Sequence, residues 1–238
     1  MKSEIKAYAK VNLFLDITGR LENGYHTLNT VMQQIDLHDD IMVDISDGDG
    51  IFIECDNPAV PCNEKNIAYK AAAAFLSETG NKAKIHINIS KNIPLEAGMG
   101  GSSTDGAAVL KLLNEMYGCP ATAEELAALG VTLGADVPYC LMLGTALSEG
   151  IGERLTPLPA APDCHCLLVK PAAGASTKQI YTDYDALVQA TDIKHPDTDA
   201  LLSALTAGDY NSLVSGLCNV LEPVTMRLVP EIAIIKET

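Results

Sequence analysis

The sequence is short of positive charge. Its 238 residues include 16 Lys and Arg against 31 Asp and Glu, which gives a formal net charge of −15. Nucleic acids and anionic membranes are bound by basic surfaces, so this balance argues against both kinds of partner. A nucleotide ligand is still feasible, because backbone amides, Mg²⁺ and a few local cations can neutralise its phosphates.

Long apolar runs, internal repeats and low-complexity tracts are absent as well. Without about eighteen consecutive apolar residues, no membrane span is predicted. The apolar stretch 11–15 stops at Asp16 and lacks a small-residue cleavage site, so it indicates a strand rather than a signal peptide. The hydrophobic fraction of 47% is ordinary for a globular protein of one large or two small domains.

The seven cysteines are odd in number and scattered along the chain. Only Cys164 and Cys166, on either side of His165, form a suggestive group, because alternation along a strand would place both thiols on one face. Two ligands without a second cluster make a weak metal site. We therefore expect no metal there, buried free thiols, and a reducing cytoplasm around the protein.

Periodicity and turn residues predict a mixture of strands and helices. Strands are expected over 5–18, 41–45, 51–55, 84–90 and 166–169, and helices over 66–79, 103–117 and 123–129 and near Thr177, Asp199 and Tyr210. The segment 47–50, with the sequence Asp-Gly-Asp-Gly, predicts a hairpin turn. The Pro-rich segment 157–162 is expected to be a linker, and 226–238 an amphipathic helix without a breaker.

The most informative segment is 93–105, with the sequence IPLEAGMGGSSTD, between the expected strand 84–90 and helix 103–117. Its three glycines free the backbone to approach a ligand closely. The hydroxyls and the acid after them are favoured N-cap residues, so the loop would deliver unpaired N–H groups at a helix N-terminus. We expect an anion, in particular a nucleotide phosphate. The alternative is a Gly-rich connection that binds nothing.

Other phosphate loops fit this segment poorly. No Lys follows the glycines, so the pattern G-x-x-x-x-G-K-[ST] is absent. Ser103 stands where the dinucleotide fingerprint requires its third glycine. The helix after the loop leads to a second helix start at Thr122, whereas a βαβ unit demands a strand.

The segment instead resembles the central motif of the GHMP kinases, through Pro94, Gly98-Met99-Gly100-Gly101 and the Ser102-Ser103 pair. These enzymes phosphorylate hydroxyls of small molecules with ATP. Three further segments, 7–13 (AYAKVNL), 20–26 (RLENGYH) and 133–139 (LGADVPY), resemble the members that act on a cytidine diphosphate-linked sugar alcohol. The resemblance runs from about Ile5 to near the C-terminus.

The resemblance implies a two-domain α+β fold. An N-terminal ATP-binding domain of the ribosomal-protein-S5-domain-2-like type would cover 1–156, and a shortened C-terminal α+β domain 163–238. It further implies transfer of the γ-phosphoryl group of ATP, with Mg²⁺, to the 2-hydroxyl of 4-(cytidine 5′-diphospho)-2-C-methyl-D-erythritol in non-mevalonate isoprenoid synthesis. Partners would be these small molecules only, bound by a cytoplasmic monomer or homodimer.

Two residues are expected to carry the catalysis. From pattern alone, Asp136 before Val-Pro indicates an N-cap, and Lys10 in an apolar strand indicates a side chain that reaches solvent at an edge. The resemblance implies instead that Asp136 accepts the proton of the substrate hydroxyl. Lys10 would then orient Asp136, keep it ionised and steady the developing negative charge.

The resemblance also implies which residues bind the two substrates. Asn12 would hydrogen-bond the sugar alcohol, Tyr25 would stack on the cytosine, and His26 would read its edge, where a pattern-only interpretation sees a surface pair. A second aromatic, Tyr181 in preference to Tyr184, would close the sandwich. The ATP-binding residues would be Pro94, Leu95, Glu96, Ala97, Gly98, Met99, Gly100, Gly101, Ser102, Ser103 and Thr104.

Two features depart from the family pattern. Ser102 stands where a third consecutive glycine is usual, which predicts altered loop geometry with retained function. The family's third motif, Ser-Gly-Ser-Gly-Pro, does not occur, so either the sequence stops short of a longer protein or ATP affinity suffers. The alternatives are therefore another GHMP kinase, of the mevalonate or homoserine type, and a non-catalytic nucleotide-binding protein or impaired fragment.

Overall fold

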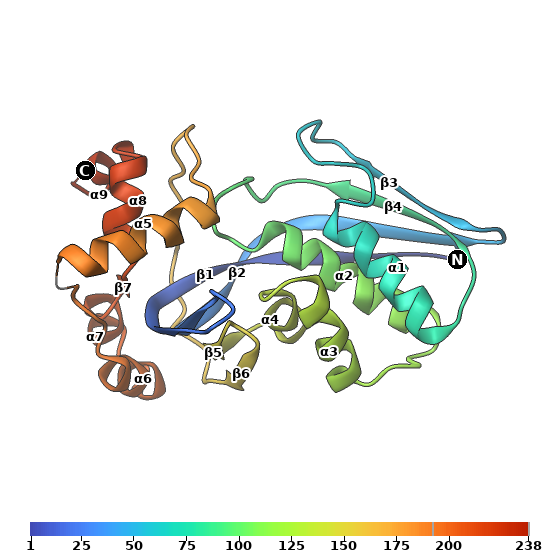
Figure 1. The fold of residues 1–238 in the computed structure, drawn as a ribbon. Helices are drawn as coiled ribbons and strands as arrows, with labels where there is room; N and C mark the ends of the chain where they lie inside the picture. The colour runs from blue at the N-terminus through green and yellow to red at the C-terminus, as the bar shows by residue number, and fades with distance from the viewer. Residues whose placement is uncertain (192, 238) are drawn as a thin grey trace. The chain divides into compact units, whose positions relative to one another are not determined.

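The computed structural model describes residues 1–191 and 193–237, which form two compact units (Figure 1). The first unit comprises residues 1–10, 34–95 and 99–143, and the second comprises 11–33, 96–98 and 144–238. Because the chain passes between the units several times, each unit is built from segments that are distant in sequence. Helices and strands mix in both, which confirms the expected α+β class.

One sheet contains all the strands that the described residues form. Its order is β3-β4-β2-β1-β7, and β5 pairs with β2 and with β6. The strands are β1 (Lys2–Arg20), β2 (His26–Ser46), β3 (Gly50–Cys55), β4 (Lys84–Ser90), β5 (Thr145–Gly150), β6 (Arg154–Pro157) and β7 (Cys218–Asn219). The two longest, β1 and β2, give residues to both units. Sequence periodicity found the middle of β1 but only the end of β2.

The predicted hairpin at 47–50 is wrong in its pairing. β2 and β3 flank the turn, yet β4 lies between them, antiparallel to β2 and parallel to β3. A Gly-rich turn reverses the chain without deciding which strand becomes the neighbour. The position between β3 and β2 buries the isoleucines of β4: Ile85, Ile87 and Ile89 are all at most 2% exposed.

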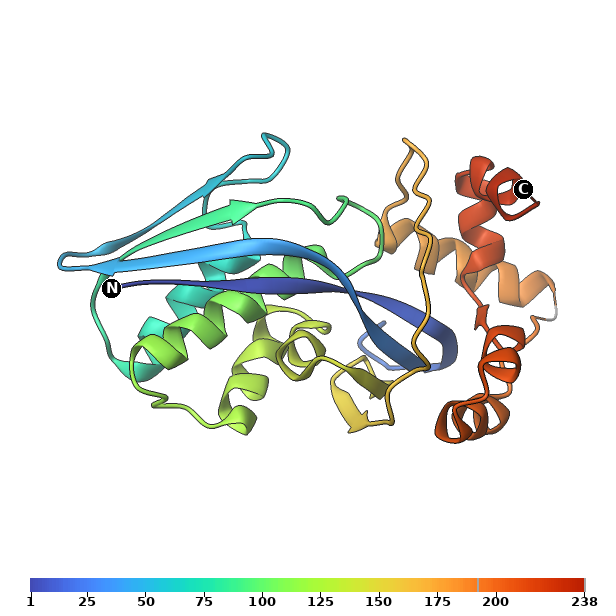
Figure 2. The ribbon, with the colours of Figure 1, turned by 180° about the vertical axis from the view of Figure 1, so that it is seen from behind.

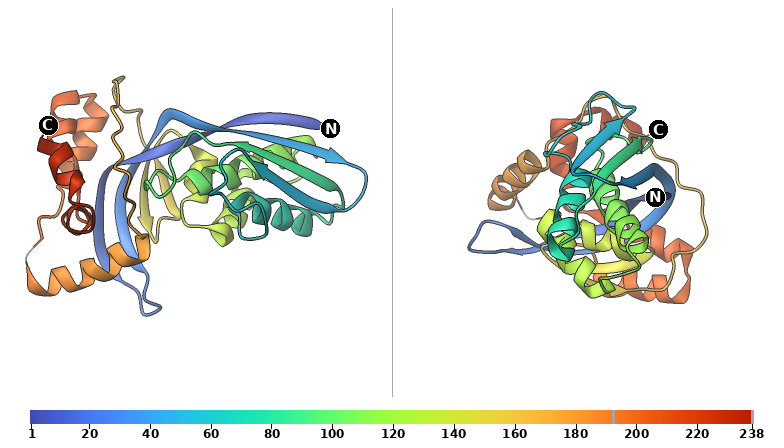
Figure 3. Two further views of the ribbon diagram at one scale, coloured as in Figure 1. Left: turned by 90° about the horizontal axis from the view of Figure 1, so that it is seen from above. Right: turned by 90° about the vertical axis from the view of Figure 1, so that its right-hand side faces the viewer.

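Four helices of the first unit pack over one face of its part of the sheet (Figure 3). They are α1 (Ile67–Thr79), α2 (Gly101–Met116), α3 (Ala123–Leu133) and α4 (Val137–Met142). The prediction for α1 is confirmed: Asn66 accepts a hydrogen bond from the amide of Ala68, and Gly80 ends the helix in the left-handed conformation. α3 runs four residues past its predicted end, and α4 was predicted only as a helix or turn start.

The second unit carries the remaining helices (Figure 2). α5 (Thr177–Ala190), α6 (Thr198–Ala207) and α7 (Tyr210–Ser215) confirm the three helices predicted there. The strand predicted over 166–169 is wrong, because these residues form no regular structure. Leu167 is 88% exposed and Val169 is 55% exposed. Apolar composition favours a strand, but a strand needs a neighbour to accept its ladder hydrogen bonds.

The helix predicted over 226–238 is interrupted. α8 (Glu222–Leu228) ends before Pro230, and α9 (Glu231–Glu237) begins after it. A proline inside a helix removes a hydrogen bond and clashes with the preceding turn, so Pro230 is the breaker that the prediction overlooked. Thr238, the last residue of the predicted run, lies outside the described residues.

All seven cysteines are free, as expected, but most are not buried. Cys140 is buried, whereas Cys62, Cys119, Cys164 and Cys166 are exposed. The described residues contain no group of three or more His, Cys, Asp or Glu that could hold a metal ion. Among the same residues, no helix is both long enough and apolar enough to cross a membrane.

Candidate active site

The predicted phosphate loop connects β4 to α2. Residues 94–100 are irregular, and α2 begins at Gly101, two residues earlier than predicted. The prediction that a hydroxyl caps this helix is therefore wrong: Gly100 is the N-cap, and no side chain makes a capping hydrogen bond. Ser102, Ser103 and Thr104 lie in the first turn. The first backbone N–H groups of a helix have no acceptor within the helix, so this end presents them as anion donors.

Gly100 is required at its position for two reasons. Its φ of 72° lies in the left-handed region, which side chains disfavour. A Cβ atom there would lie 3.2 Å from Cγ of Lys10, and that distance is tighter than ordinary contact. The amide of Lys10 also donates to the carbonyl oxygen of Met99 at 3.1 Å. Lys10 thus lies directly against the start of α2.

Lys10 forms an ion pair with Asp136. The ammonium nitrogen is 3.8 Å from Oδ2 of Asp136, and the side chains are 7% and 34% exposed. The prediction that Lys10 reaches solvent is therefore wrong. A lysine is almost never buried without a partner, because removing its charge from water costs several kcal/mol. The structure brings together the two residues that were expected to carry catalysis.

Asp136 occupies the N-cap position of α4 without capping it. Its side chain makes no hydrogen bond to the first turn, and Pro138 follows in that turn. The position is that of a cap, but the carboxylate is directed to Lys10. The neighbouring Gly134 packs beside α2, where a Cβ would lie 3.9 Å from Oγ of Ser103. The carboxylate of Asp136 therefore lies near the start of α2, where the loop ends.

A buried ionic cluster that the sequence analysis missed joins the two ends of the loop. The ammonium of Lys91 donates to Oδ2 of Asp39 at 2.5 Å and to Oδ2 of Asp105 at 2.7 Å. All three side chains are at most 3% exposed. Burial raises the pKa of Asp105 to about 7, even though Lys91 opposes the rise. A signal was present, because Lys91 and Asp105 flank the glycine-rich segment, but Asp39 is distant in sequence.

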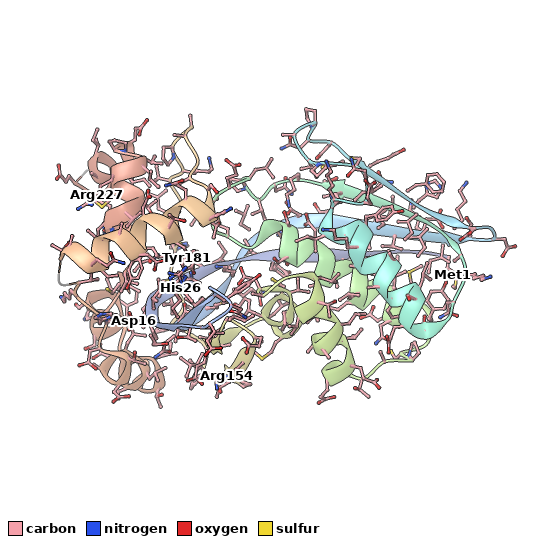
Figure 4. All side chains as sticks on the ribbon, viewed as in Figure 1. Met1, Asp16, His26, Arg154, Tyr181 and Arg227 are labelled. Carbon is pink, nitrogen blue, oxygen red and sulfur yellow. The ribbon has the colours of Figure 1, made fainter. Side chains whose placement is uncertain are left out.

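In the second unit, an imidazole and an aromatic ring form the centre of another polar cluster. The ring of His26 stacks on that of Tyr181, with centroids 4.9 Å apart and planes 26° from parallel (Figure 4). Nε2 of His26 lies 2.7 Å from Oδ1 of Asp185, and Oδ2 of Asp185 lies 3.0 Å from Arg20. Asp185 is a further residue that sequence reasoning missed, since nothing links it to His26 except the fold.

The other predicted substrate residues take varied positions. Tyr25 is 61% exposed at the tight turn between β1 and β2. Asn12 is half-buried in β1. Tyr184 is 3% exposed and belongs to an apolar core with Leu15 and Val224, so its ring face is already occupied.

Glu96 is the strained residue of the loop. Its φ of 54° places it in the left-handed region, which costs a residue with a side chain roughly 1 kcal/mol or more. A Cβ at Gly174 would lie 2.5 Å from a carboxylate oxygen of Glu96, so that glycine permits the approach of the side chain. Strain of this kind is often found at functional sites.

Known proteins resemble the chain in its motifs and in its fold. The family model for the GHMP kinases N terminal domain matches residues 66–144, which contain the loop and Asp136. The 4-diphosphocytidyl-2-C-methyl-D-erythritol kinase of Clostridium botulinum (strain Alaska E43 / Type E3) is 45% identical over 98% of this chain and 82% of the relative. The kinase of the same name from Lachnoclostridium phytofermentans is 46% identical over 98% of this chain and 79% of its own length.

Solved structures agree with these relatives. A crystal structure of 4-(cytidine 5′-diphospho)-2C-methyl-D-erythritol kinase superposes with a TM-score of 0.76 at 33% identity, over 98% of this chain and 81% of the other. Homoserine kinase from Cytophaga hutchinsonii, at 20% identity and a TM-score of 0.69, shares the fold. The chain therefore belongs to the GHMP kinases, within the family of the 4-diphosphocytidyl-2-C-methyl-D-erythritol kinases.

Proposed function

We propose that this chain transfers the γ-phosphoryl group of ATP to the 2-hydroxyl of 4-(cytidine 5′-diphospho)-2-C-methyl-D-erythritol, in the non-mevalonate route to isoprenoids. Relatives that carry this kinase name at 45–46% identity support the substrate. The observation that carries the reaction is the ion pair of Lys10 with Asp136 against the N-terminus of α2. The first unit therefore places a carboxylate that can act as a base close to a helix N-terminus that can bind an anion.

Asp136 is the proposed general base. Its carboxylate takes the proton of the 2-hydroxyl as that oxygen bonds to the γ-phosphorus and the bond from phosphorus to the bridging oxygen of ADP breaks. Positioned bases contribute about 10²- to 10⁴-fold to such reactions. Lys10 orients Asp136 through the ion pair at 3.8 Å and stabilises negative charge that develops nearby.

The residues 94–104 are proposed to hold the phosphates of ATP. The amides at the start of α2 donate to phosphate oxygens, and the partial positive charge of the helix end favours the anion. Mg²⁺ is proposed to accompany the nucleotide, and when bound it would neutralise charge on the transferred group.

The second unit is proposed to recognise the cytidyl substrate. Tyr25, which is 61% exposed, would stack on the cytosine, and Tyr181 would supply the second aromatic face. His26 would read the edge of the base through the atoms that Asp185 leaves available, and Asn12 would hydrogen-bond the sugar alcohol. Tyr184 is a poor candidate because it is buried in the core.

We also propose that the chain works in the cytoplasm, as a monomer or homodimer. All seven thiols are free, four of them exposed, which suits a reducing compartment.

Substrate-dependent formation of ADP tests the proposed function. We expect ADP from Mg·ATP with the cytidyl substrate and none with mevalonate or homoserine. Asp136→Asn should lower kcat at least a hundredfold. Asp197→Asn is the matched control, because Asp197 is also an N-cap but bonds the first turn of α6; its kcat should stay within twofold of the original. Turnover of homoserine or mevalonate would show that the proposed substrate is wrong. Binding of Mg·ATP and of the cytidyl substrate without formation of ADP would show that the chain is a non-catalytic nucleotide-binding protein.

A further inference from the structure

The cluster of Lys91, Asp39 and Asp105 connects three elements of the first unit. Lys91 directly follows β4, Asp39 lies in β2, and Asp105 is the fifth residue of α2. Lys91 bonds both carboxylates. Oδ1 of Asp39 accepts from the amides of Asn92 at 2.6 Å and Ile93 at 2.8 Å. Asp39 therefore fixes the residues that enter the loop, and Lys91 extends this fixation to the helix that follows the loop.

The cluster lies directly under the helix end that is proposed to bind phosphate. A Cβ at Gly101, the first residue of α2, would lie 3.2 Å from the ammonium nitrogen of Lys91. The side chain of Lys91 is 2% exposed and its ammonium has both carboxylates as partners, so it is not available to a phosphate. A cation beside the positive end of a helix is unfavourable by itself, and the two carboxylates compensate for it.

Burial of Asp105 costs free energy that its hydrogen bond to Lys91 does not fully offset. Its Oδ1 is buried and has no hydrogen-bond partner within the described residues. An unsatisfied buried oxygen destabilises a fold by about 1–3 kcal/mol. An apolar residue of similar size would avoid this cost. The observed arrangement makes sense if the bond from Lys91 to α2 serves the loop rather than the stability of the fold.

We propose that Lys91 is a positioning residue of the ATP site, and that its bonds to Asp39 and Asp105 hold the two ends of the phosphate loop together so that the amides of α2 stay aimed at the phosphates. Lys91 acts through the loop and does not touch ATP. A misplacement of about 1 Å is enough to weaken such a site substantially. The inference rests on the proposed role of residues 94–104 in binding ATP.

Asp105→Leu tests this proposal, because it cuts the bond to α2 while leaving Lys91 paired with Asp39. We expect an ATP KM and a Kd for Mg·ADP, measured by calorimetry, at least tenfold above the original, with an unchanged or higher melting temperature. The KM for the cytidyl substrate should stay within twofold. Lys91→Met should weaken Mg·ADP similarly and lower the melting temperature, because two buried carboxylates then face each other. The variant that combines Lys91→Met with Asp105→Leu should regain the melting temperature that Lys91→Met loses, but its affinity for Mg·ADP should stay low.

Lys111→Met is the matched control, since Lys111 is a half-buried lysine of α2 outside the cluster; its Kd should equal the original. If Asp105→Leu does not fold, Asp105→Asn replaces it, with at least a threefold rise expected. Affinity that is unchanged, tighter, or lost only in step with the melting temperature would overturn the proposal. Failure of the unaltered chain to bind Mg·ADP would instead overturn the proposed function and this inference with it.

Discussion

Each unit contains an aspartate paired with a basic side chain, and the two pairs are built differently. In the first unit, Asp136 is 3.8 Å from Lys10 and is 34% exposed. In the second, Asp185 is 2.7 Å from His26 and 3.0 Å from Arg20, so both its oxygens have partners. The first carboxylate is held loosely and the second tightly.

The difference matches the work proposed for each acid. A general base must keep an oxygen free enough to accept a proton, so a strong hydrogen bond to it would reduce its basicity. An acid that orients an imidazole works best with a short, charge-assisted hydrogen bond. The looser pair is thus suited to chemistry and the tighter pair to recognition, and separate kinetic constants should report them.

Lys10→Met should have the largest effect and should fall on kcat. Loss of the ammonium leaves Asp136 without the partner that orients it and removes a positive charge from the transferred group, so we expect kcat to drop at least a hundredfold. The KM for the cytidyl substrate should change less than threefold, as measured from initial rates of ADP formation. Lys6→Met, at an exposed position of the same strand, is the control. A rise in the substrate KM with unchanged kcat would contradict the assignment of catalysis to the first unit.

Asp185→Asn should have an intermediate effect and should fall on substrate binding. Hydrogen bonds to charged groups contribute about 1.5–3 kcal/mol, and the lower value corresponds to about tenfold in affinity. We expect the KM for the cytidyl substrate to rise about tenfold, with the ATP KM and kcat within twofold. Asp183→Asn is the control, because Asp183 is half-buried on the same helix, as Asp185 is, and accepts a hydrogen bond from Gln179. An equal fall in kcat would show that the two pairs are not separable.

Local sequence signals predicted the parts of the first unit that depend on neighbours in the chain. The end of α1 at Gly80 and the loop between β4 and α2 follow from residues within a few positions of one another. The pairing of β3 with β4 did not follow, because a turn specifies the reversal and not the partner. Strand partners are chosen by burial across the whole sheet.

In the candidate sites, too, local features were predicted and long-range contacts were missed. Lys10 and Asp136 were predicted through motifs, yet their contact depends on Gly100, which lets the lysine approach α2. Asp39 and Asp185 were missed, because an isolated aspartate carries no local signal and acquires its role from a side chain 52 or 159 residues away. Long-range ion pairs of this kind are a property of the fold.

Asp105, in the first unit, should make the stability of the fold depend on pH. Its folded pKa, raised to about 7, lies above its ordinary value of 3.8, so the folded state binds the proton more tightly. Its contribution is therefore fully present below about pH 4 and is lost as the pH rises through 7. The groups that face it are Lys91, Asp39 and Cys140. We compare the free energy of unfolding of the original chain with that of Asp105→Asn. Between about pH 4 and pH 7, the value for the original chain should fall relative to the variant by on the order of 1 kcal/mol per pH unit. Urea unfolding at several pH values measures it, and a flat difference would contradict the assignment.

Glu96→Gly should give the smallest effect and a rise in stability. Glu96 has a φ of 54°, and glycine adopts this conformation without strain. We expect the free energy of unfolding to increase by about 0.5–1 kcal/mol, since the strain of roughly 1 kcal/mol or more is offset in part by the greater freedom of glycine in the unfolded chain. Ala97→Gly is the control: Ala97 has no positive φ, so the same change should lower stability by a similar amount. Urea unfolding of both variants decides the sign. If Glu96→Gly also weakens Mg·ADP, the strain at Glu96 contributes to the shape of the loop; if both variants lose stability equally, the left-handed conformation of Glu96 carries no strain.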